Sequence, residues 1–251
     1  MGTLTGEARS AKGGLAAGGK KNVPAPVVVS GLVFELEQLA VPGQHLLFEA
    51  CQKVLKDKQI VLTPALWSRF GLAAPLAEAL NRLLATADRK PLSGDKLALE
   101  AQEAFLRAIA RPTLKLNGAL DELLREAARA NIKVGALSLL PGDRAQALLA
   151  HLGLQERVSL QVMAQKGAPA PTAEGWLMTC KAIGVSARCS VALASSAQAN
   201  YAALGAGLRC VVIPNEFTSY QDFGGADLVV EDLKELRVKD LHSLLRSCSF
   251  R

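Results

Sequence analysis

A valine-rich run at residues 27–34 ends in two carboxylates that stand one residue apart, Glu35 and Glu37. A run of this kind, preceded by a Gly-, Lys- and Pro-containing segment, is typical of a parallel strand that is buried on both faces. In open α/β sheets, ligands bind beyond the carboxyl ends of such strands. We therefore expect a binding edge where this run ends.

The spacing of the two carboxylates carries a further prediction. Residues i and i+2 of a strand point to the same side, so Glu35 and Glu37 are expected to face one pocket while Leu36 packs beneath them. Two acids in this arrangement suit a cation site or an acid/base pair. They also fit a strand end that simply reaches solvent. This stretch alone leaves both interpretations open.

The size and composition of the chain indicate a helix-rich protein. It has 251 residues, of which 50% are hydrophobic and 4% aromatic. This length suits one large α/β domain, or a core domain with a smaller inserted one.

No apolar run approaches the roughly 20 residues that cross a bilayer, and no secretory h-region begins the sequence. We expect a cytoplasmic protein.

The cysteines and histidines show no pattern of a metal or catalytic site. The five cysteines lack CxxC spacing and are predicted to be reduced, buried small hydrophobic residues. The three histidines are far apart in the sequence, and we assign them no function. These residues are Cys51, Cys180, Cys189, Cys210 and Cys248, with His45, His151 and His242.

The net charge of +6 arises mainly from two segments, residues 1–26 and 43–111. The first is Gly-, Ala- and Lys-rich, cannot bury enough apolar surface to fold, and is predicted to be a flexible tail. No basic groove interleaved with aromatic residues accompanies it. We expect no membrane partner, and no nucleic acid partner beyond a weak contact through this tail.

Helical periodicity dominates residues 43–111, and strands alternate with helices from residue 112 onward. In the first part, helices are predicted over 45–55, from Pro64 after the N-cap Thr63, over 74–87 and over 95–109. In the second part, the predicted strands are 133–138, 158–162, 190–193, 209–213 and 226–230. The predicted helices between and after them are 119–130, 143–152, 172–183, 197–204 and 232–246.

This alternation predicts an α/β fold with a Rossmann-like, doubly wound parallel sheet. The sheet domain is expected to comprise residues 27–42 and 112–251. Residues 43–111 are expected to form a small all-helical cap, inserted after the first strand.

Four segments at predicted strand ends and loops carry recognisable motifs. They are Phe34-Glu35-Leu36-Glu37-Gln38-Leu39-Ala40, Val134-Gly135-Ala136-Leu137-Ser138, Lys166-Gly167-Ala168-Pro169-Ala170-Pro171 and Val191-Ala192-Leu193-Ala194-Ser195-Ser196, the last followed by Ala202-Ala203-Leu204-Gly205-Ala206-Gly207-Leu208. Together they resemble the haloacid dehalogenase (HAD) superfamily of phosphohydrolases, in its β-phosphoglucomutase and phosphoglycolate phosphatase branch. The resemblance covers about residues 27–246.

The resemblance implies a degenerate catalytic set. Family members begin with Phe-Asp-x-Asp-Gly-Thr-Leu, in which the first Asp is the nucleophile and the second a general acid/base. Glu35 and Glu37 occupy these positions, and the extra methylene of a glutamate moves its carboxylate by about 1.5 Å. A misplacement of about 1 Å costs on the order of 100-fold in rate. Gln38 replaces the glycine that lets the backbone approach phosphate.

This sequence lacks the family's metal-binding carboxylate but has residues that match the family's phosphate ligands. Ala194 and Ser195 occupy the fourth motif, where the family has a carboxylate that helps to hold Mg²⁺, and they supply none. Ser138 and Lys166 match the family's phosphate-binding Ser or Thr and Lys. No cofactor is expected, and Mg²⁺ only if the protein is active.

Three functions are compatible with these residues. The first is a non-catalytic pseudophosphatase that binds a protein partner or a small anionic ligand. The second is a slow or altered phosphomonoester hydrolase that uses Glu35 or Glu37, with a metal carboxylate supplied from elsewhere, for example by Glu216 or Asp222. The third is a nucleic-acid or membrane-surface adaptor that uses the basic tail. We favour the first because nucleophile, metal carboxylates and loop glycine change together while the strand and helix pattern persists.

Overall fold

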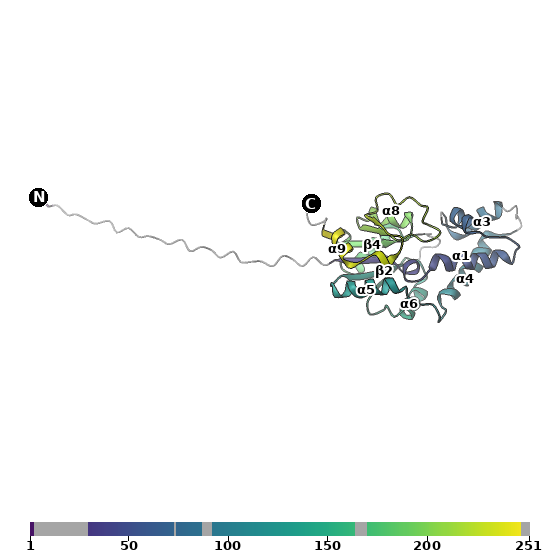
Figure 1. Cartoon of the computed structure of the whole chain (residues 1–251), viewed down its shortest axis with the longest axis horizontal. Coiled ribbons are helices and arrows are strands. Elements are labelled where there is room, and N and C mark those ends of the chain that lie inside the picture. Colours follow the sequence, from purple (N-terminus) through teal and green to yellow (C-terminus); the bar gives the residue numbers. More distant parts are fainter. Residues whose placement is uncertain (3–29, 73, 87–91, 164–169, 247–251) are drawn as a thin grey trace.

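The computed structural model describes residues 1–2, 30–72, 74–86, 92–163 and 170–246. Nearly all of the predicted tail, Lys166 and Cys248 lie outside these residues. Within the described part, helices pack on both faces of a central sheet, and a group of helices extends from one end of it (Figure 1). None of the described helices is long and apolar enough to span a membrane.

The sheet has six parallel strands in the order β3-β2-β1-β4-β5-β6. The first strand therefore lies inside the sheet, between β2 and β4. Strands β2 and β3 are added on one side of β1 and strands β4 to β6 on the other, so the strand order reverses between β1 and β4. Such a reversal is the point where open α/β sheets bind ligands. The strands are β1 Gly31–Glu35, β2 Lys133–Ser138, β3 Ser159–Val162, β4 Ser190–Ala194, β5 Arg209–Val212 and β6 Leu228–Val229. The predicted fold class is confirmed.

Side chains of β1 alternate between two hydrophobic layers. Leu32 and Phe34 pack with residues of α5 (Gly118–Arg129), α6 (Gly142–His151) and α9 (Val238–Arg246). Val33 packs on the opposite face with residues of α7 (Ala173–Ala182) and α8 (Ala197–Gly205). All five residues of β1 are buried, because both faces of the strand are covered.

Between β1 and α5 the described elements are helices. They are α1 Gly43–Lys56, α2 Pro64–Phe70, α3 Leu76–Thr86 and α4 Gly94–Ile109. As predicted, Thr63 caps α2, and its hydroxyl accepts the Leu66 N–H at 3.3 Å. We call α1–α4 the helical segment. The boundaries at residues 42/43 and 111/112 remain predictions.

The last helix begins later than predicted, at Val238 rather than at residue 232. Asp232 caps a short 3₁₀ turn at Leu233–Glu235, where its side chain accepts the Lys234 N–H at 2.9 Å. The Glu235 side chain accepts the Asp232 N–H in return, at 3.2 Å. This reciprocal cap satisfies the backbone locally, so the chain turns before α9 begins.

A loop that follows β5 fastens the helical segment to the sheet. Its residue Phe217 is 1% exposed and lies in the hydrophobic cluster of the helical segment, with its ring centroid 5.0 Å from that of Phe48. On either side of it, Glu216 Oε1 lies 2.5 Å from His45 Nδ1, and the Tyr220 hydroxyl donates to the Ser68 carbonyl at 2.5 Å. Phe217 therefore stabilises the helical segment although it is far away in sequence.

Phe217→Ala is predicted to lower the free energy of unfolding by about 3–5 kcal/mol, because it leaves a cavity in a closed apolar cluster. Urea denaturation measures this loss. Hydrogen exchange is expected to rise more at the amides of α1 and α2 than at those of β1 and β4, since the contact holds the helical segment.

Leu99→Ala in α4 is the control, because Leu99 is 63% exposed. Its effect should stay within about 0.5 kcal/mol. A loss below about 1 kcal/mol in Phe217→Ala would contradict the fastening role of this side chain.

Candidate functional site

Strand β1 ends at Glu35, and residues Leu36–Ala40 form a single turn of π-helix. The alternation of a strand therefore stops before Glu37. This corrects the prediction that Glu35 and Glu37 face one pocket together, because the turn aims the two carboxylates at different strands. Helix α1 begins directly against the turn, and a side chain at Gly43 would clash with the Glu37 carbonyl oxygen.

Glu37 reaches the carboxyl end of β2. Its Oε1 accepts the Ser138 hydroxyl at 2.6 Å, the Leu139 N–H at 2.8 Å and the Leu140 N–H at 2.9 Å. Glu37 is 6% exposed and Ser138 is fully buried. The predicted phosphate ligand Ser138 is thus at the expected edge of the sheet, and its hydroxyl is bonded to a carboxylate of the same chain.

Glu35 reaches the opposite neighbour, the carboxyl end of β4. Its Oε2 accepts the Ser195 N–H at 2.6 Å. The carbonyl of the same residue accepts the Thr218 hydroxyl at 2.8 Å, and Thr218 Oγ1 accepts the Asn215 N–H at 2.9 Å. The backbone N–H and the carbonyl of Ser195 are therefore both hydrogen-bonded. Glu35 fixes the loop after β4 by accepting one of these bonds.

Burial raises the pKa of both glutamates. Desolvation raises the pKa of Glu35 from its ordinary value of 4.5 to about 7; the hydrogen bonds from Ser195 oppose this rise, and the nearby charge of Glu37 adds to it. Desolvation also raises the pKa of Glu37, against the hydrogen bonds from Ser138, Leu139 and Leu140. Within the part of the chain described, neither glutamate pairs with a Lys, Arg or His.

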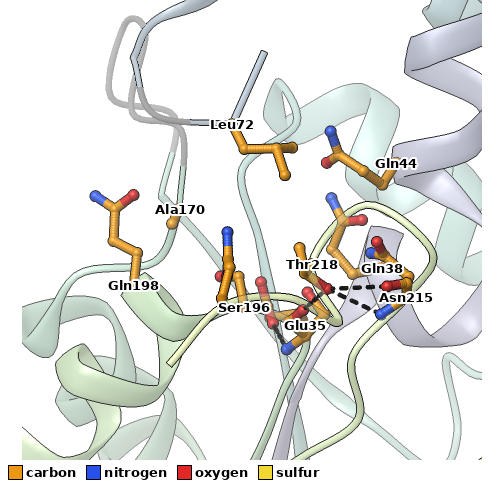
Figure 2. Close-up of a pocket in the computed structure, with 11 residues that line it drawn as sticks. Glu35, Gln38, Gln44, Leu72, Ala170, Ser196, Gln198, Asn215 and Thr218 are labelled. Atoms are coloured by element: carbon orange, nitrogen blue, oxygen red, sulfur yellow. Dashed lines mark hydrogen bonds between the residues drawn. The ribbon is translucent and has the colours of Figure 1, made fainter. Parts of the chain in front are cut away.

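A small pocket of about 40 Å³ opens above Glu35 (Figure 2). This volume holds a few water molecules, since each needs about 10–15 Å³. Neutral polar side chains dominate its described lining, and the Gln38 Oε1 is buried without a hydrogen-bond partner. The lining residues are Glu35, Gln38, Gln44, Leu72, Ala170, Ser195, Ser196, Gln198, Asn215, Thr218 and Gln221.

The residues at this edge do not fit Mg²⁺. Ala194 is apolar, and Ser195 donates its N–H to the Glu35 carboxyl. A carboxyl with a pKa of about 7 is a weaker metal ligand than an ordinary glutamate, because it must lose its proton first. Over the described residues, no three His, Cys, Asp or Glu side chains gather as a metal site.

The two acids that were considered as substitute metal ligands are engaged elsewhere. Glu216 contacts His45 on the helical segment. Asp222 accepts the Gly224 N–H at 2.9 Å and lies beside the Tyr201 hydroxyl. Neither acid lines the pocket. Lys166, the other predicted phosphate ligand, lies outside the described residues, and phosphate binding by Ser138 and Lys166 remains a prediction.

Several residues of the pocket were not predicted. Asn215 and Thr218 belong to a loop that follows the end of β5, and the place of this loop at the carboxyl edge was a usable signal. Gln44 and Leu72 come from the helical segment and reach the pocket only through tertiary packing. In Figure 2 they lie opposite Glu35, on the far side of the opening.

A six-stranded parallel sheet with this binding edge, and with helices inserted after the first strand, defines an α/β protein with a HAD-like phosphatase fold. Comparison with curated proteins supports this class. Protein CbbY of Cereibacter sphaeroides is 29% identical over 153 residues, which are 59% of this chain and 66% of CbbY, just under two thirds of its length. The putative phosphatase YhcW of Bacillus subtilis (strain 168) is 24% identical over 224 residues, 88% of this chain and 99% of YhcW.

Solved structures share the fold at low sequence identity. CbbY from Rhodobacter sphaeroides, solved with phosphate, has a TM-score of 0.67 at 21% identity, covering 83% of this chain and 96% of that one. The β-phosphoglucomutase of Clostridium difficile has a TM-score of 0.69 at 18% identity, with coverages of 89% and 100%. A predicted phosphoglycolate phosphatase from Haemophilus somnus 129pt gives 0.68 at 14% identity, with coverages of 85% and 98%.

No family model matches the chain. The curated relatives and the shared fold nevertheless agree with the motifs: the chain is similar to proteins of the haloacid dehalogenase-like superfamily, in the branch of β-phosphoglucomutase and phosphoglycolate phosphatase.

The raised pKa of Glu35 predicts that folding stability falls as the pH rises. The folded protein favours the protonated carboxyl, so this contribution is present below about pH 4.5 and is lost as the pH passes through about 7. Glu35→Gln keeps a neutral side chain at every pH. Urea denaturation from pH 5 to pH 8 should show the wild type losing up to about 3 kcal/mol relative to this variant.

Glu100→Gln is the matched control, because Glu100 is an exposed glutamate on α4. Its stability should follow the wild type across the same pH range. If Glu35→Gln and the wild type kept a constant difference between pH 5 and 8, Glu35 would be an ordinary, solvated carboxylate.

Proposed function

We propose that this protein is a non-catalytic member of the superfamily, a pseudophosphatase that acts by binding a protein partner or a small ligand. The observation that carries the proposal is the state of the edge between β1 and β4. There the Glu35 carboxyl accepts the Ser195 N–H at 2.6 Å, and the neighbouring residue is Ala194. Where a metal and a nucleophile would work together, the chain has a hydrogen bond between its own residues.

Two physical consequences of this edge support the proposal. A buried glutamate with a pKa of about 7 is partly protonated near neutral pH, and a protonated carboxyl is a poor nucleophile. Without a cation, nothing relieves the repulsion between a carboxylate and the phosphate that it would attack. Both effects raise the energy barrier to phosphoryl transfer.

One observation favours the alternative, a slow phosphomonoester hydrolase. A carboxyl with a pKa near the working pH is suited to general acid/base catalysis, and Glu35 has such a pKa and lines the pocket. The nucleophile and the charge stabilisation would then have to come from other groups. We therefore rank this function second, and a basic-tail adaptor third. A cytoplasmic location and the identity of the partner remain predictions.

Turnover of phosphomonoesters tests the proposal directly. With Mg²⁺ and a panel of sugar phosphates and phosphoglycolate, the wild type is expected to stay at the uncatalysed background. Turnover near the roughly 1–10 per second of an ordinary enzyme, abolished by Glu35→Gln, would overturn the proposal and support the hydrolase.

Restoring the family residues tests the same idea in the opposite direction. The combined variant Glu35→Asp, Glu37→Asp, Gln38→Gly and Ser195→Asp is predicted to raise Mg²⁺-dependent turnover above background. Each single change should do almost nothing, because catalytic groups act as a unit. The readout is phosphate release with and without Mg²⁺, and circular dichroism checks that each variant is folded. Equal turnover in the combined variant and the wild type would count against an inherited phosphatase frame.

A further inference from the structure

We infer that a protein partner binds this chain through an extended acidic segment, in a groove at the amino edge of the sheet. This edge is opposite the pocket above Glu35. The groove, which we call the amino-edge groove, is lined by residues 132–134, 155–159 and 182–183, where β2 and β3 begin and α7 ends. Its volume is about 390 Å³, compared with about 40 Å³ for the pocket above Glu35. The inference rests on the proposed function, because it names the chemistry of the partner.

Two cations line the amino-edge groove. Gly135 pairs with Ser159 in the sheet, so Lys133 and Arg157 each lie two residues before one pair and are level with each other. Lys133 is exposed and forms no ion pair with any described residue. The Arg157 guanidinium lies 2.8 Å from the Asp121 carboxylate.

The charge of Arg157 is only partly balanced by that ion pair. Asp121 also lies 2.5 Å from the Arg125 guanidinium, so two arginines share one carboxylate. Glu156 is the one acid in the described lining of the groove. An excess of positive charge therefore remains around the groove.

Further cations lie at the same edge of the sheet. Helices α5 and α7 and the 3₁₀ turn Ala187–Cys189 each end shortly before a strand begins, and each has a basic residue in its last turn: Arg129, Lys181 and Arg188. All three side chains are exposed, and none forms an ion pair with a described residue. Cations at helix C-termini stabilise the helices themselves. Their summed field also attracts acidic partners to this edge.

Strand β3 offers backbone groups to an extended peptide. In the described sheet it pairs with β2 alone, and its residues Ser159–Val162 are exposed or half-buried. The outer edge of such a strand can take up a peptide as one further strand. Because Ser159 also lines the groove, one end of an added strand lies at the groove, where acidic side chains meet Lys133 and Arg157.

The other polyanions and a second copy of the chain fit this edge less well. The described lining of the groove has no aromatic side chain on which a base could stack. A twofold contact between two copies would bring the same cations together, and like charges repel. A groove beside an open strand edge suits a peptide, and its charge requires that the peptide be acidic.

Fluorescence anisotropy of the full chain with a short labelled peptide, in which Glu alternates with Thr, tests the inference. K133E reverses the charge in the groove, and K133R keeps it. K96E is the matched control, because Lys96 is an exposed lysine on α4, in the helical segment, and its substitution changes the net charge equally. The same peptide with Gln in place of Glu is the ligand control. Circular dichroism confirms folding, and K133Q replaces K133E if that variant does not fold.

The wild type is expected to bind the acidic peptide saturably, and binding should weaken as salt is added, because salt screens exposed charges. K133E should raise the Kd about tenfold or more, since it replaces an attraction by a repulsion. K133R and K96E should stay within about twofold of the wild type. The Gln peptide should bind about tenfold more weakly than the Glu peptide.

Four results would overturn the inference. The first is an acidic peptide that does not saturate the wild type up to about 1 mM. The second is an equal loss of binding in K133E and K96E, which would show an effect of net charge alone. The third is an oligouridine that binds more tightly than the peptide and depends on Lys133. The fourth is a dimer of the wild type, seen in sedimentation velocity, that K133E dissociates.

Phosphomonoester turnover separates this inference from the proposed function, because Glu35 lies at the opposite edge of the sheet. A wild type that stays at background turnover but does not bind the peptide overturns the inference alone. A wild type that binds the peptide through Lys133 and also turns over phosphomonoesters overturns the pseudophosphatase proposal and leaves the peptide site in place.

Discussion

The structure depends on satisfying two carboxylates that are buried without a described cation. Removing a carboxylate from water is expensive unless hydrogen bonds replace its solvation. Glu35 and Glu37 are 5% and 6% exposed, and each obtains its donors from the strand on one side of β1. The loops after β2 and β4 must therefore present their N–H groups to the end of β1. The site is held together by this requirement as well as by apolar packing.

The same bonds determine what this edge of the sheet can bind. In a parallel sheet, the carboxyl ends of the strands present unpaired backbone groups and short polar side chains, which is why ligands bind there. In this chain, Glu37 takes the donors after β2 and Glu35 takes the donor after β4. The groups that would meet a ligand meet side chains instead. Each glutamate side chain is long enough to bond this edge internally.

The elements of the fold followed from the sequence because their signals are local. The valine-rich run, the N-cap Thr63 and the alternation after residue 112 each depend on neighbouring residues, and the structure has these elements. The directions of Glu35 and Glu37 did not follow, because a π-helical turn replaces the strand geometry after Glu35. Gln44 and Phe217 were not foreseen either, since only tertiary packing brings them to their contacts.

The composition of the pocket has a kinetic consequence. Glu35 is the one ionisable side chain among the described lining residues; the rest are neutral amides, hydroxyls and apolar groups. When Glu35 is protonated, the described lining carries no net charge, so it adds no electrostatic steering to the approach of a small molecule. Entry should then depend little on salt, since there is no lining charge to screen. Once Glu35 ionises, the same lining repels anions. The pH of the solution therefore governs which molecules can enter the pocket.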